Sequence, residues 1–330
     1  MSQKVLYMGR SPLEHRAVTL SVEPAGFENV WIESGDPAEL ESKLAEADFI
    51  VTGSINAAQV ALAKKARLIQ MPGVGYENID VAAANARGIP VAITPEGTCE
   101  GVAEHTIMMM LALCKHLTEA HNELTQGRWI HNQLRHTALM LGGKRVGIMG
   151  LGRIGREVAQ RLAGWNVDLV YSDIFPAPPD LEATLKVRRL SQEELLRTSD
   201  IVTLHTFLSA QTHHMIDERA LRSMKPTAIL INTSRGPVVD EQALYRALRD
   251  RVIAAAGIDA WEEEPTPPDN PILKLDNVLI TPHMATANKD AMIEKSRACY
   301  ANFERVLRGE PPINTVRPYA EVITAAVPAR

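Results

Sequence analysis

Short apolar runs alternate with longer amphipathic stretches along almost the whole chain of 330 residues. Short continuous apolar runs are typical of strands buried on both faces, and the stretches between them have the spacing of helices. The alternation predicts a parallel α/β architecture, because consecutive parallel strands need a crossover that is usually a helix. The chain is too long for one ordinary core, so we expect two domains.

The first part of the chain predicts a small doubly wound unit. The expected strands lie at 5–8, 49–51, 68–71 and 91–93, and the expected helices between them at 38–47, 57–65 and 81–87. A long helix should follow from about Gly101 to Leu117. No phosphate-binding fingerprint occurs in this part of the sequence.

A second set of predicted strands follows the long helix, and six of them fit a complete dinucleotide-binding domain. They cover 146–149, 168–171, 201–204, 228–232, 254–258 and 278–281, with a helix at 241–249. The chain then holds one more predicted helix, 289–307, which is too little for a third domain. We therefore expect residues 1–99 and 288–330 to form one discontinuous domain, with a nucleotide domain of residues 100–287 inserted into it.

A glycine-rich turn stands where the second set of strands begins. It has the pattern G-x-G-x-x-G and consists of Gly150, Leu151, Gly152, Arg153, Ile154 and Gly155. The turn follows a predicted strand and precedes a predicted helix, and Asp173 ends the next strand. Such a strand–helix–strand unit binds a dinucleotide, because the glycines let the backbone approach a pyrophosphate at the positive end of the helix. A tight turn without a ligand is the alternative, and the acid in register argues against it.

Asp173 indicates which dinucleotide is bound. A carboxylate at the tip of the second strand accepts hydrogen bonds from the adenosine ribose hydroxyls and repels the extra phosphate of NADP. No Lys or Arg follows Asp173 in the sequence until Lys186. We therefore expect NAD. An aspartate that merely caps a loop is the alternative.

Three later strands end in residues that suit a reaction site, at the sheet edge where such folds bind ligands. Arg235 lies on a tight turn before Gly236 and Pro237, where a guanidinium can hold a carboxylate by two parallel hydrogen bonds. Glu264 stands beside a proline after the next strand, and His283 follows the last strand and a proline. Each has a plain alternative: a surface ion pair, a solvated acidic loop and a structural histidine, respectively.

Together these three side chains suit hydride transfer. Removal of hydride from a secondary alcohol leaves a proton, which a neutral imidazole accepts near neutral pH. Glu264 would hold the ring of His283 and favour its charged form. Arg235 would stabilise the negative charge that develops on the oxygen. The sequence shows no cluster of metal ligands, and we expect no metal.

The motifs resemble those of the D-isomer-specific 2-hydroxyacid dehydrogenases, in order and spacing, over nearly the whole chain. They are the fingerprint 150–155 with Asp173, the segments 233–240, 257–265 and 277–283, the loop 72–80 and the segment 102–106. The resemblance implies a two-domain enzyme, usually a homodimer, with a Rossmann-type NAD domain inserted into a flavodoxin-like substrate domain. It also implies a small D-2-hydroxy acid or 2-keto acid as substrate, of the hydroxypyruvate, glyoxylate or 3-phosphoglycerate type.

The resemblance further implies roles for single residues. Arg235 would bind the substrate carboxylate and polarise the carbonyl, with the backbone of Val74 and Gly75 beside it, while His283 and Glu264 would be the acid/base pair. The other expected cofactor contacts are Thr106, His205, Thr206, Thr233, Ser234 and, at the nicotinamide carboxamide, Asp259. Phe207 departs from the family pattern, in which proline is common on this loop near the nicotinamide.

Composition narrows the partners and the location. The net charge is −5 and the sequence contains no basic block, which argues against nucleic acid or an anionic membrane as the partner. The most apolar predicted helix is too short to cross a bilayer. Cys99, Cys114 and Cys299 lack metal-binding spacing, and no signal-peptide pattern is present. We therefore expect reduced thiols and a cytoplasmic location.

Two other functions fit parts of the pattern. A phosphite-type dehydrogenase on the same fold shares the Arg, Glu and His constellation, and NAD-sensing corepressor-like scaffolds resemble the family too. We expect no long disordered tail of the kind that such scaffolds use, which argues against a scaffold. The identity of the acid stays open, and the candidates for recognising its side chain are Ser54, Asn56, Tyr76 and the segment 129–135, in which Arg135 or His131 would favour a charged or hydroxylated acid.

Overall fold

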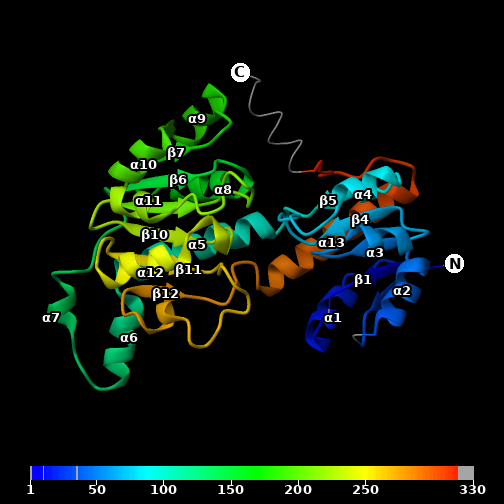
Figure 1. Ribbon diagram of the computed structural model, residues 1–330, viewed down its shortest axis with the longest axis horizontal. Helices are drawn as coiled ribbons and strands as arrows, with labels where there is room; N and C mark the ends of the chain where they lie inside the picture. The colour runs from blue at the N-terminus through cyan, green and yellow to red at the C-terminus, as the bar shows by residue number, and fades with distance from the viewer. Residues whose placement is uncertain (1, 10, 35, 319–330) are drawn as a thin grey trace. The chain divides into compact units, whose positions relative to one another are not determined.

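The computed structural model describes residues 2–9, 11–34 and 36–318. The chain divides into two compact units, each built around one parallel sheet (Figure 1). Unit 1 contains the residues up to 98 and those from 287 onward, and unit 2 contains residues 99–286. Both units have the α/β architecture that the alternating pattern predicts. The substrate and nucleotide roles of the two units stay a prediction.

The sheet of unit 1 has five strands in the order β2-β1-β3-β4-β5, which is the flavodoxin-like order. The strands are β1 (Gln3–Tyr7), β2 (Phe27–Trp31), β3 (Phe49–Val51), β4 (Leu68–Met71) and β5 (Val91–Ile93). The helices are α1 (Leu13–Leu20), α2 (Pro37–Glu46), α3 (Ala57–Leu62), α4 (Val81–Ala86) and α13 (Lys289–Leu307). The sequence did not predict β2 and α1. Both lack a long apolar run, because β2 is a half-exposed edge strand and α1 buries only Thr19.

Helix α13 completes unit 1 from the far end of the sequence. Phe303 stacks on Phe49 of β3 with ring centroids 4.5 Å apart, inside a buried cluster that also contains residues of β1, β4 and β5. Gly97 lies just before the chain leaves this unit and has a φ of +67°. A Cβ at Gly97 would stand 2.8 Å from the Cα of Ala291, so the departing segment and the returning helix are packed backbone to backbone.

The sheet of unit 2 has seven strands in the order β12-β11-β10-β9-β6-β7-β8. They are β6 (Arg145–Met149), β7 (Asp168–Ser172), β8 (Val187–Arg189), β9 (Ile201–Leu204), β10 (Ile229–Asn232), β11 (Ala255–Ile258) and β12 (Val278–Ile280). This is the Rossmann order with one added strand at its end. The expectation of six strands was wrong, because β8 is a short edge strand with two exposed arginines that do not resemble a buried run.

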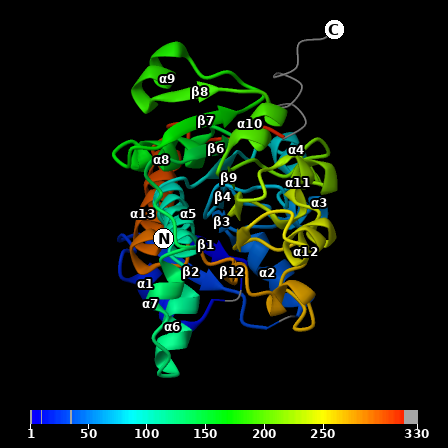
Figure 2. The same cartoon turned by 90° about the vertical axis from the view of Figure 1, so that its left-hand side faces the viewer.

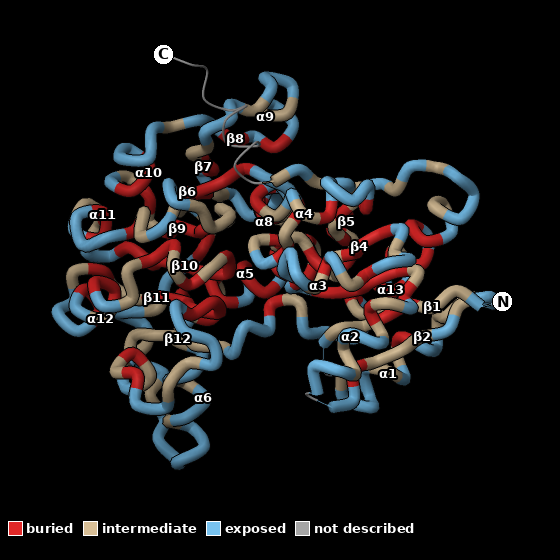
Figure 3. The backbone as a smooth tube through the Cα atoms, turned by 45° about the vertical axis from the view of Figure 1, so that its right-hand side comes forward, coloured by how far each residue is buried: buried red, intermediate tan, exposed pale blue. Residues whose placement is uncertain are grey.

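Helices cover both faces of this sheet, and the strands between them are largely buried (Figure 3). The helices are α5 (Thr98–Cys114), α6 (Leu117–Thr125), α7 (His131–Leu134), α8 (Arg153–Leu162), α9 (Pro179–Leu185), α10 (Gln192–Thr198), α11 (Glu218–Ser223) and α12 (Glu241–Arg249), with short 3-10 turns η1 (Gly236–Val238) and η2 (Pro271–Lys274). Helices α5 and α8 pack on one face through Met109, Met110 and Val158. Helices α11 and α12 pack on the other through Leu221 and Leu244.

The long helix predicted to reach Leu117 ends earlier. His116 has a left-handed φ of 51°, which breaks the helix after Cys114, and α6 begins at the next residue. Helices α6 and α7 then stand away from the sheet of unit 2 in two perpendicular views (Figures 1 and 2). In the part of the chain that the structure describes, no helix combines the length and apolarity that a membrane span requires.

Candidate active site

Three neighbouring strands of unit 2 end side by side. Asn232 of β10 is in register with Ile258 of β11, which is in register with Ile280 of β12. The chain therefore leaves the sheet along one edge three times, into the segments that contain Arg235, Glu264 and His283. The sequence predicted these residues as a group because each follows a strand, and the parallel pairing accounts for their shared edge.

The first segment, the Arg235 turn (residues 232–236), is shaped by a buried asparagine. The Oδ1 of Asn232 accepts hydrogen bonds from Ser234 N–H at 3.1 Å and from its hydroxyl at 2.8 Å. The Nδ2 of Asn232 donates to the Arg235 carbonyl at 3.0 Å, and Arg235 Nη1 donates to the Ser234 carbonyl at 2.7 Å. These bonds fix the backbone on both sides of the half-buried Arg235.

The Arg235 turn is pressed against the second segment, the Glu264 loop (residues 261–264). A Cβ at Gly236 would lie 1.8 Å from the Trp261 carbonyl oxygen and 2.3 Å from Glu262 N. Only glycine permits this approach, because the atoms that a larger residue would meet belong to the backbone. The contact therefore sets the position of Arg235 relative to the loop that contains Glu264.

The second and third segments meet in a histidine–carboxylate pair. His283 Nδ1 lies 2.7 Å from Glu264 Oε2 and 2.9 Å from Oε1, and Oε1 also accepts a hydrogen bond from Trp261 N–H at 2.9 Å. An ionised carboxylate only accepts, so Nδ1 is the nitrogen that bears hydrogen. In a neutral ring Nε2 then has a free lone pair for a proton. Both side chains are partly exposed.

Asp259 holds the third segment, the His283 loop (residues 281–285), from beneath. Its carbonyl accepts His283 N–H at 2.9 Å, and its carboxylate accepts Thr281 Oγ1 at 2.5 Å, Met284 N–H at 2.8 Å and Ala285 N–H at 3.0 Å. The Asp259 side chain is only 1% exposed. The sequence predicted a nicotinamide contact for Asp259 but not these hydrogen bonds to the His283 loop. Any residue type can supply a backbone N–H, so such bonds cannot be read from the sequence.

Helix α5 lies behind the same edge and supplies two polar side chains. His105 Nε2 is 3.1 Å from Thr281 Oγ1 and 3.5 Å from Asp259 Oδ1, and burial lowers the pKa of His105 while Asp259 opposes that shift. Thr106, predicted as a cofactor contact, is fully buried. Its hydroxyl donates to the Val102 carbonyl at 2.7 Å and lies 2.9 Å from Thr233 Oγ1. Both partners of the Thr106 hydroxyl are therefore groups of the protein itself.

The glycine turn fits a dinucleotide. It lies at the end of β6, where the strand order reverses between β6 and β9. Gly150 has a φ of +92°, and a Cβ there would stand 2.8 Å from the His205 carbonyl oxygen, while one at Gly155 would stand 2.2 Å from the Gly150 oxygen. A Cβ at Gly152, the N-cap of α8, would meet no described atom within 4 Å. Two glycines therefore close the turn, and the third opens the helix N-terminus to an anion.

Asp173 closes the glycine turn from the next strand, and the structure adds a cation beside it. Its Oδ2 accepts Leu151 N–H at 2.7 Å and its Oδ1 accepts Phe175 N–H at 2.9 Å. Arg189 Nη2 donates to the Asp173 carbonyl at 2.8 Å. The sequence pointed to Lys186 as the first cation after Asp173, but the pairing of β8 with β7 brings Arg189 back beside it. The sequence did not indicate that Arg189 is a neighbour of Asp173, because the two residues are far apart along the chain.

The remaining predicted contacts are divided between the units. In unit 2, burial lowers the pKa of His205 to about 3, and its Nε2 lies 2.9 Å from Thr203 Oγ1, while its buried Nδ1 has no hydrogen-bond partner among the described residues. Thr206 Oγ1 lies 3.8 Å from Met215 Sδ. In unit 1, Val74 and Gly75 lie half-buried in the loop after β4.

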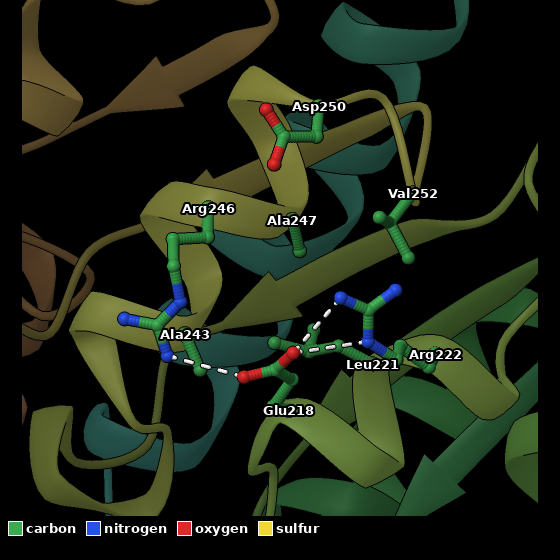
Figure 4. A pocket seen from close by; sticks show the side chains of 8 residues that line it. All are labelled: Glu218, Leu221, Arg222, Ala243, Arg246, Ala247, Asp250 and Val252. Atoms are coloured by element: carbon green, nitrogen blue, oxygen red, sulfur yellow. Dashed lines mark hydrogen bonds and ion pairs between the residues drawn. The ribbon is translucent and has the colours of Figure 1, made fainter.

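The structure also contains a pocket that takes no part in this arrangement (Figure 4). It is lined by Glu218, Leu221, Arg222, Ala243, Arg246, Ala247, Asp250 and Val252, from α11, α12 and the residues after α12. Glu218 pairs with Arg222 at 2.9 Å and with Arg246 at 3.4 Å. None of the predicted site residues lines it. Within 2–9, 11–34 and 36–318, no group of His, Cys, Asp or Glu side chains has a metal-binding arrangement.

Comparisons with known proteins agree with this geometry. The family described as "D-isomer specific 2-hydroxyacid dehydrogenase, NAD binding domain" matches residues 107–285. The chain is 39% identical to a glyoxylate reductase of Korarchaeum cryptofilum over 297 residues, which are 87% of this chain and 89% of that protein. It is 36% identical to a D-3-phosphoglycerate dehydrogenase of Methanocaldococcus jannaschii over 84% of this chain and 53% of that protein.

A solved structure extends the agreement to the fold of the chain. The 2-hydroxyacid dehydrogenase of Ketogulonicigenium vulgare superposes with a TM-score of 0.82 and 31% identity, covering 96% of this chain and 99% of that one. The family match spans the glycine turn and the segments of Arg235, Glu264 and His283. The chain therefore belongs to the D-isomer specific 2-hydroxyacid dehydrogenases, NAD-dependent oxidoreductases that transfer a hydride between nicotinamide and a 2-hydroxy or 2-keto acid.

Proposed function

We propose that this dehydrogenase acts on a short 2-keto acid of the glyoxylate or hydroxypyruvate type and on the matching 2-hydroxy acid. The observation that carries the proposal is the pair of His283 and Glu264 next to the Arg235 turn, on one edge of the sheet. The relative named glyoxylate reductase aligns over 89% of its own length, whereas the phosphoglycerate dehydrogenase aligns over 53%. We therefore place 3-phosphoglycerate second.

Arg235 binds the acid in this proposal. Its guanidinium offers paired N–H donors that match a carboxylate, and its positive charge stabilises the negative charge that develops on the carbonyl oxygen. The bonds within the Arg235 turn hold its backbone before substrate arrives. Val74 and Gly75 remain candidates for a second contact to the carboxylate.

His283 transfers the proton, and Glu264 holds it for that task. In reduction the charged imidazole gives a proton from Nε2 to the carbonyl oxygen, and in oxidation the neutral ring takes it back. The bond from Nδ1 to Glu264 fixes the orientation of the ring and the position of its proton. Bound nicotinamide supplies or accepts the hydride.

The glycine turn and Asp173 hold the dinucleotide. The open N-terminus of α8 at Gly152 suits the pyrophosphate, and the Asp173 carboxylate suits the adenosine ribose. Both Asp173 oxygens already accept backbone hydrogen bonds, which orient the carboxylate, and each oxygen has a further lone pair for a hydroxyl. His205, Thr206, Thr233 and Ser234 are proposed to line the path toward the nicotinamide.

Two of the residues considered for recognising the acid's side chain have other tasks. Asn56 caps α3, accepting Gln59 N–H at 2.9 Å while its own N–H donates to Gln59 Oε1. Tyr76 is buried in the core of unit 1. The choice of substrate then rests on Ser54 and on the segment 129–135.

A panel of acids tests the proposal. We expect NADH oxidation with glyoxylate, hydroxypyruvate, pyruvate and 3-phosphohydroxypyruvate to rank the first two highest in kcat/KM, with no reduction of NAD by phosphite. Turnover of phosphite and of no acid would show that the protein is a phosphite-type dehydrogenase instead. Tight NADH binding without turnover of any acid would support the scaffold instead.

We further propose that the protein is a homodimer joined through the segment 117–140. This segment exposes several large apolar side chains, namely Leu117, Leu124, Trp129, Leu139 and Met140, and Trp129 is 76% exposed. Large exposed apolar side chains that gather in one segment suit an interface, and a second copy is the partner we assign. Sedimentation velocity should show a dimer that Trp129→Glu dissociates. Trp165→Glu, at an exposed tryptophan outside the segment, should not dissociate it, and a monomeric wild type would exclude the interface.

A cytoplasmic location completes the proposal. Cys99, Cys114 and Cys299 are all buried free thiols, which suits a reducing compartment. Burial raises the pKa of Cys299 to about 12, so its thiol stays protonated and unreactive. Cell fractionation with antibody detection tests the location, and recovery in an extracellular or periplasmic fraction would exclude it.

A further inference from the structure

We propose that His105 is a positioning residue for proton transfer: together with Thr281 it forms a hydrogen-bond chain to Asp259 that fixes the His283 loop. The proposal rests on the proposed role of His283 and adds a residue that has no assigned task. His105 comes from α5, whereas Asp259 follows β11 and Thr281 follows β12. This hydrogen-bond chain thus connects α5 to the ends of β11 and β12.

The direction of each hydrogen bond follows from the donors available. Thr281 has one hydroxyl proton, and it must go to Asp259 Oδ1 at 2.5 Å because an ionised carboxylate only accepts. Thr281 Oγ1 is then the acceptor toward His105, so Nε2 of His105 bears hydrogen and donates over 3.1 Å. The same nitrogen lies 3.5 Å from Asp259 Oδ1. The tautomer of His105 is assigned from this network.

Burial raises the free-energy cost of breaking this hydrogen-bond chain. Asp259 is 1% exposed and His105 is 9% exposed, so water replaces a lost partner poorly. Burial lowers the pKa of His105, which keeps the ring neutral near neutral pH with a single N–H to place. Removal of either donor would leave the next acceptor in the chain under-satisfied.

The hydrogen-bond chain ends at Asp259, which binds the loop that contains His283, the residue proposed to transfer the proton. Asp259 accepts the three successive amides of His283, Met284 and Ala285, through its carbonyl and both carboxylate oxygens. His283 has a left-handed φ of 49°, a conformation that costs a non-glycine residue free energy and persists where its surroundings impose it. Asp259 supplies that constraint, and Thr281 orients Asp259.

His105, at the other end of the hydrogen-bond chain, lies on a helix that is packed into a core. Helix α5 is packed into the core of unit 2 through Met109 and Met110, and a Cβ at Gly257 of β11 would lie 3.3 Å from Met109 Sδ. Helix and strand are therefore in close contact one turn away from His105. A donor on such a platform holds its acceptor more precisely than one on a loop.

Paired substitutions separate this role from simple packing. His105→Leu and Thr281→Val keep most of the volume but remove the hydroxyl or N–H, whereas His105→Gln and Thr281→Ser retain a donor. We expect each of the first two to lower kcat by about tenfold, roughly the contribution of one hydrogen bond, and each of the second two to restore most of it. The double variant should be no slower than either single one, because both break the same chain.

A readout on the free protein keeps the test independent of the reaction. Hydrogen exchange of the amides 283–285 should quicken by about tenfold in His105→Leu and Thr281→Val. It should stay unchanged in His15→Leu, at an exposed histidine of α1 in unit 1. Equal kcat for His105→Leu and His105→Gln, additive losses in the double variant, or unaltered exchange at 283–285 would each overturn the proposal. Should the wild type turn over no acid, the proposed function fails, while quickened exchange would still support the positioning.

Discussion

Gly236→Ala tests whether the contact between the Arg235 turn and the Glu264 loop positions the reacting side chains. The added Cβ would stand 1.8 Å from the Trp261 oxygen, 1.9 Å from its carbonyl carbon and 2.3 Å from Glu262 N. An unstrained carbon keeps about 3.5 Å from such atoms, so the two loops must separate by more than about 1 Å. All three obstructing atoms are backbone, and no rotamer change relieves the overlap.

The displacement predicts two measurable losses. Arg235 and Glu264 lie on the two loops that separate, and a 1 Å misplacement at a reaction site costs about a hundredfold in rate. Overpacking of this kind also lowers the free energy of unfolding by about 1–3 kcal/mol. We therefore expect kcat/KM for the preferred acid to fall by about a hundredfold or more in a protein that still folds.

Steady-state kinetics and thermal unfolding of one preparation check both numbers. The matched control is Gly164→Ala, where a Cβ would meet no described atom within 4 Å. That variant should retain wild-type kinetics. If Gly236→Ala behaves like Gly164→Ala, the backbone contact does not position the site, and the reasoning is refuted.

Three further outcomes follow from the site. Arg235→Ala should raise KM for the acid far more than KM for NADH and also lower kcat; a loss confined to NADH would mean that Arg235 does not hold the carboxylate. Reduction of the keto acid needs protonated His283 and should weaken as pH rises, whereas oxidation needs the neutral ring and should weaken as pH falls, so parallel pH limbs would remove His283 from proton transfer. Asp173→Ala should narrow the preference for NAD over NADP in kcat/KM, and adding Arg189→Ala should reduce the use of NADPH again; an unchanged preference would contradict the role of Asp173.

Strands made of continuous apolar runs were predictable from the sequence, and strands with exposed polar positions were not. Strands β3, β4 and β9 consist of continuous apolar runs, and their predicted bounds match the structure. Strands β2 and β8 lie at sheet edges with one or more polar positions exposed, so neither has the pattern of a buried strand. The end of α5 was also missed, because the left-handed residue that breaks the helix is a histidine rather than glycine.

The site divides in the same way. The location of Arg235, Glu264 and His283 at one sheet edge was predictable because the ends of parallel strands share an edge, and His283 lies within hydrogen-bond distance of Glu264. Contacts between residues of different strands could not be recognised in the sequence. Arg189 lies beside Asp173 through strand pairing, and Asp259 acts on the backbone of the His283 loop. Residue type shows what a side chain can do, whereas its partner depends on the fold.

The packing of Gly97 against Ala291 has a consequence for the engineering of unit 1. The segment that leaves unit 1 and the helix that returns to it touch there, so unit 2 enters the sequence of unit 1 at what is spatially a single point. A gene in which a short turn replaced residues 99–286 would join two ends that are already adjacent, with little loop-closure entropy to overcome. We therefore expect the sheet of unit 1 to accept a different insert at this junction without redesign.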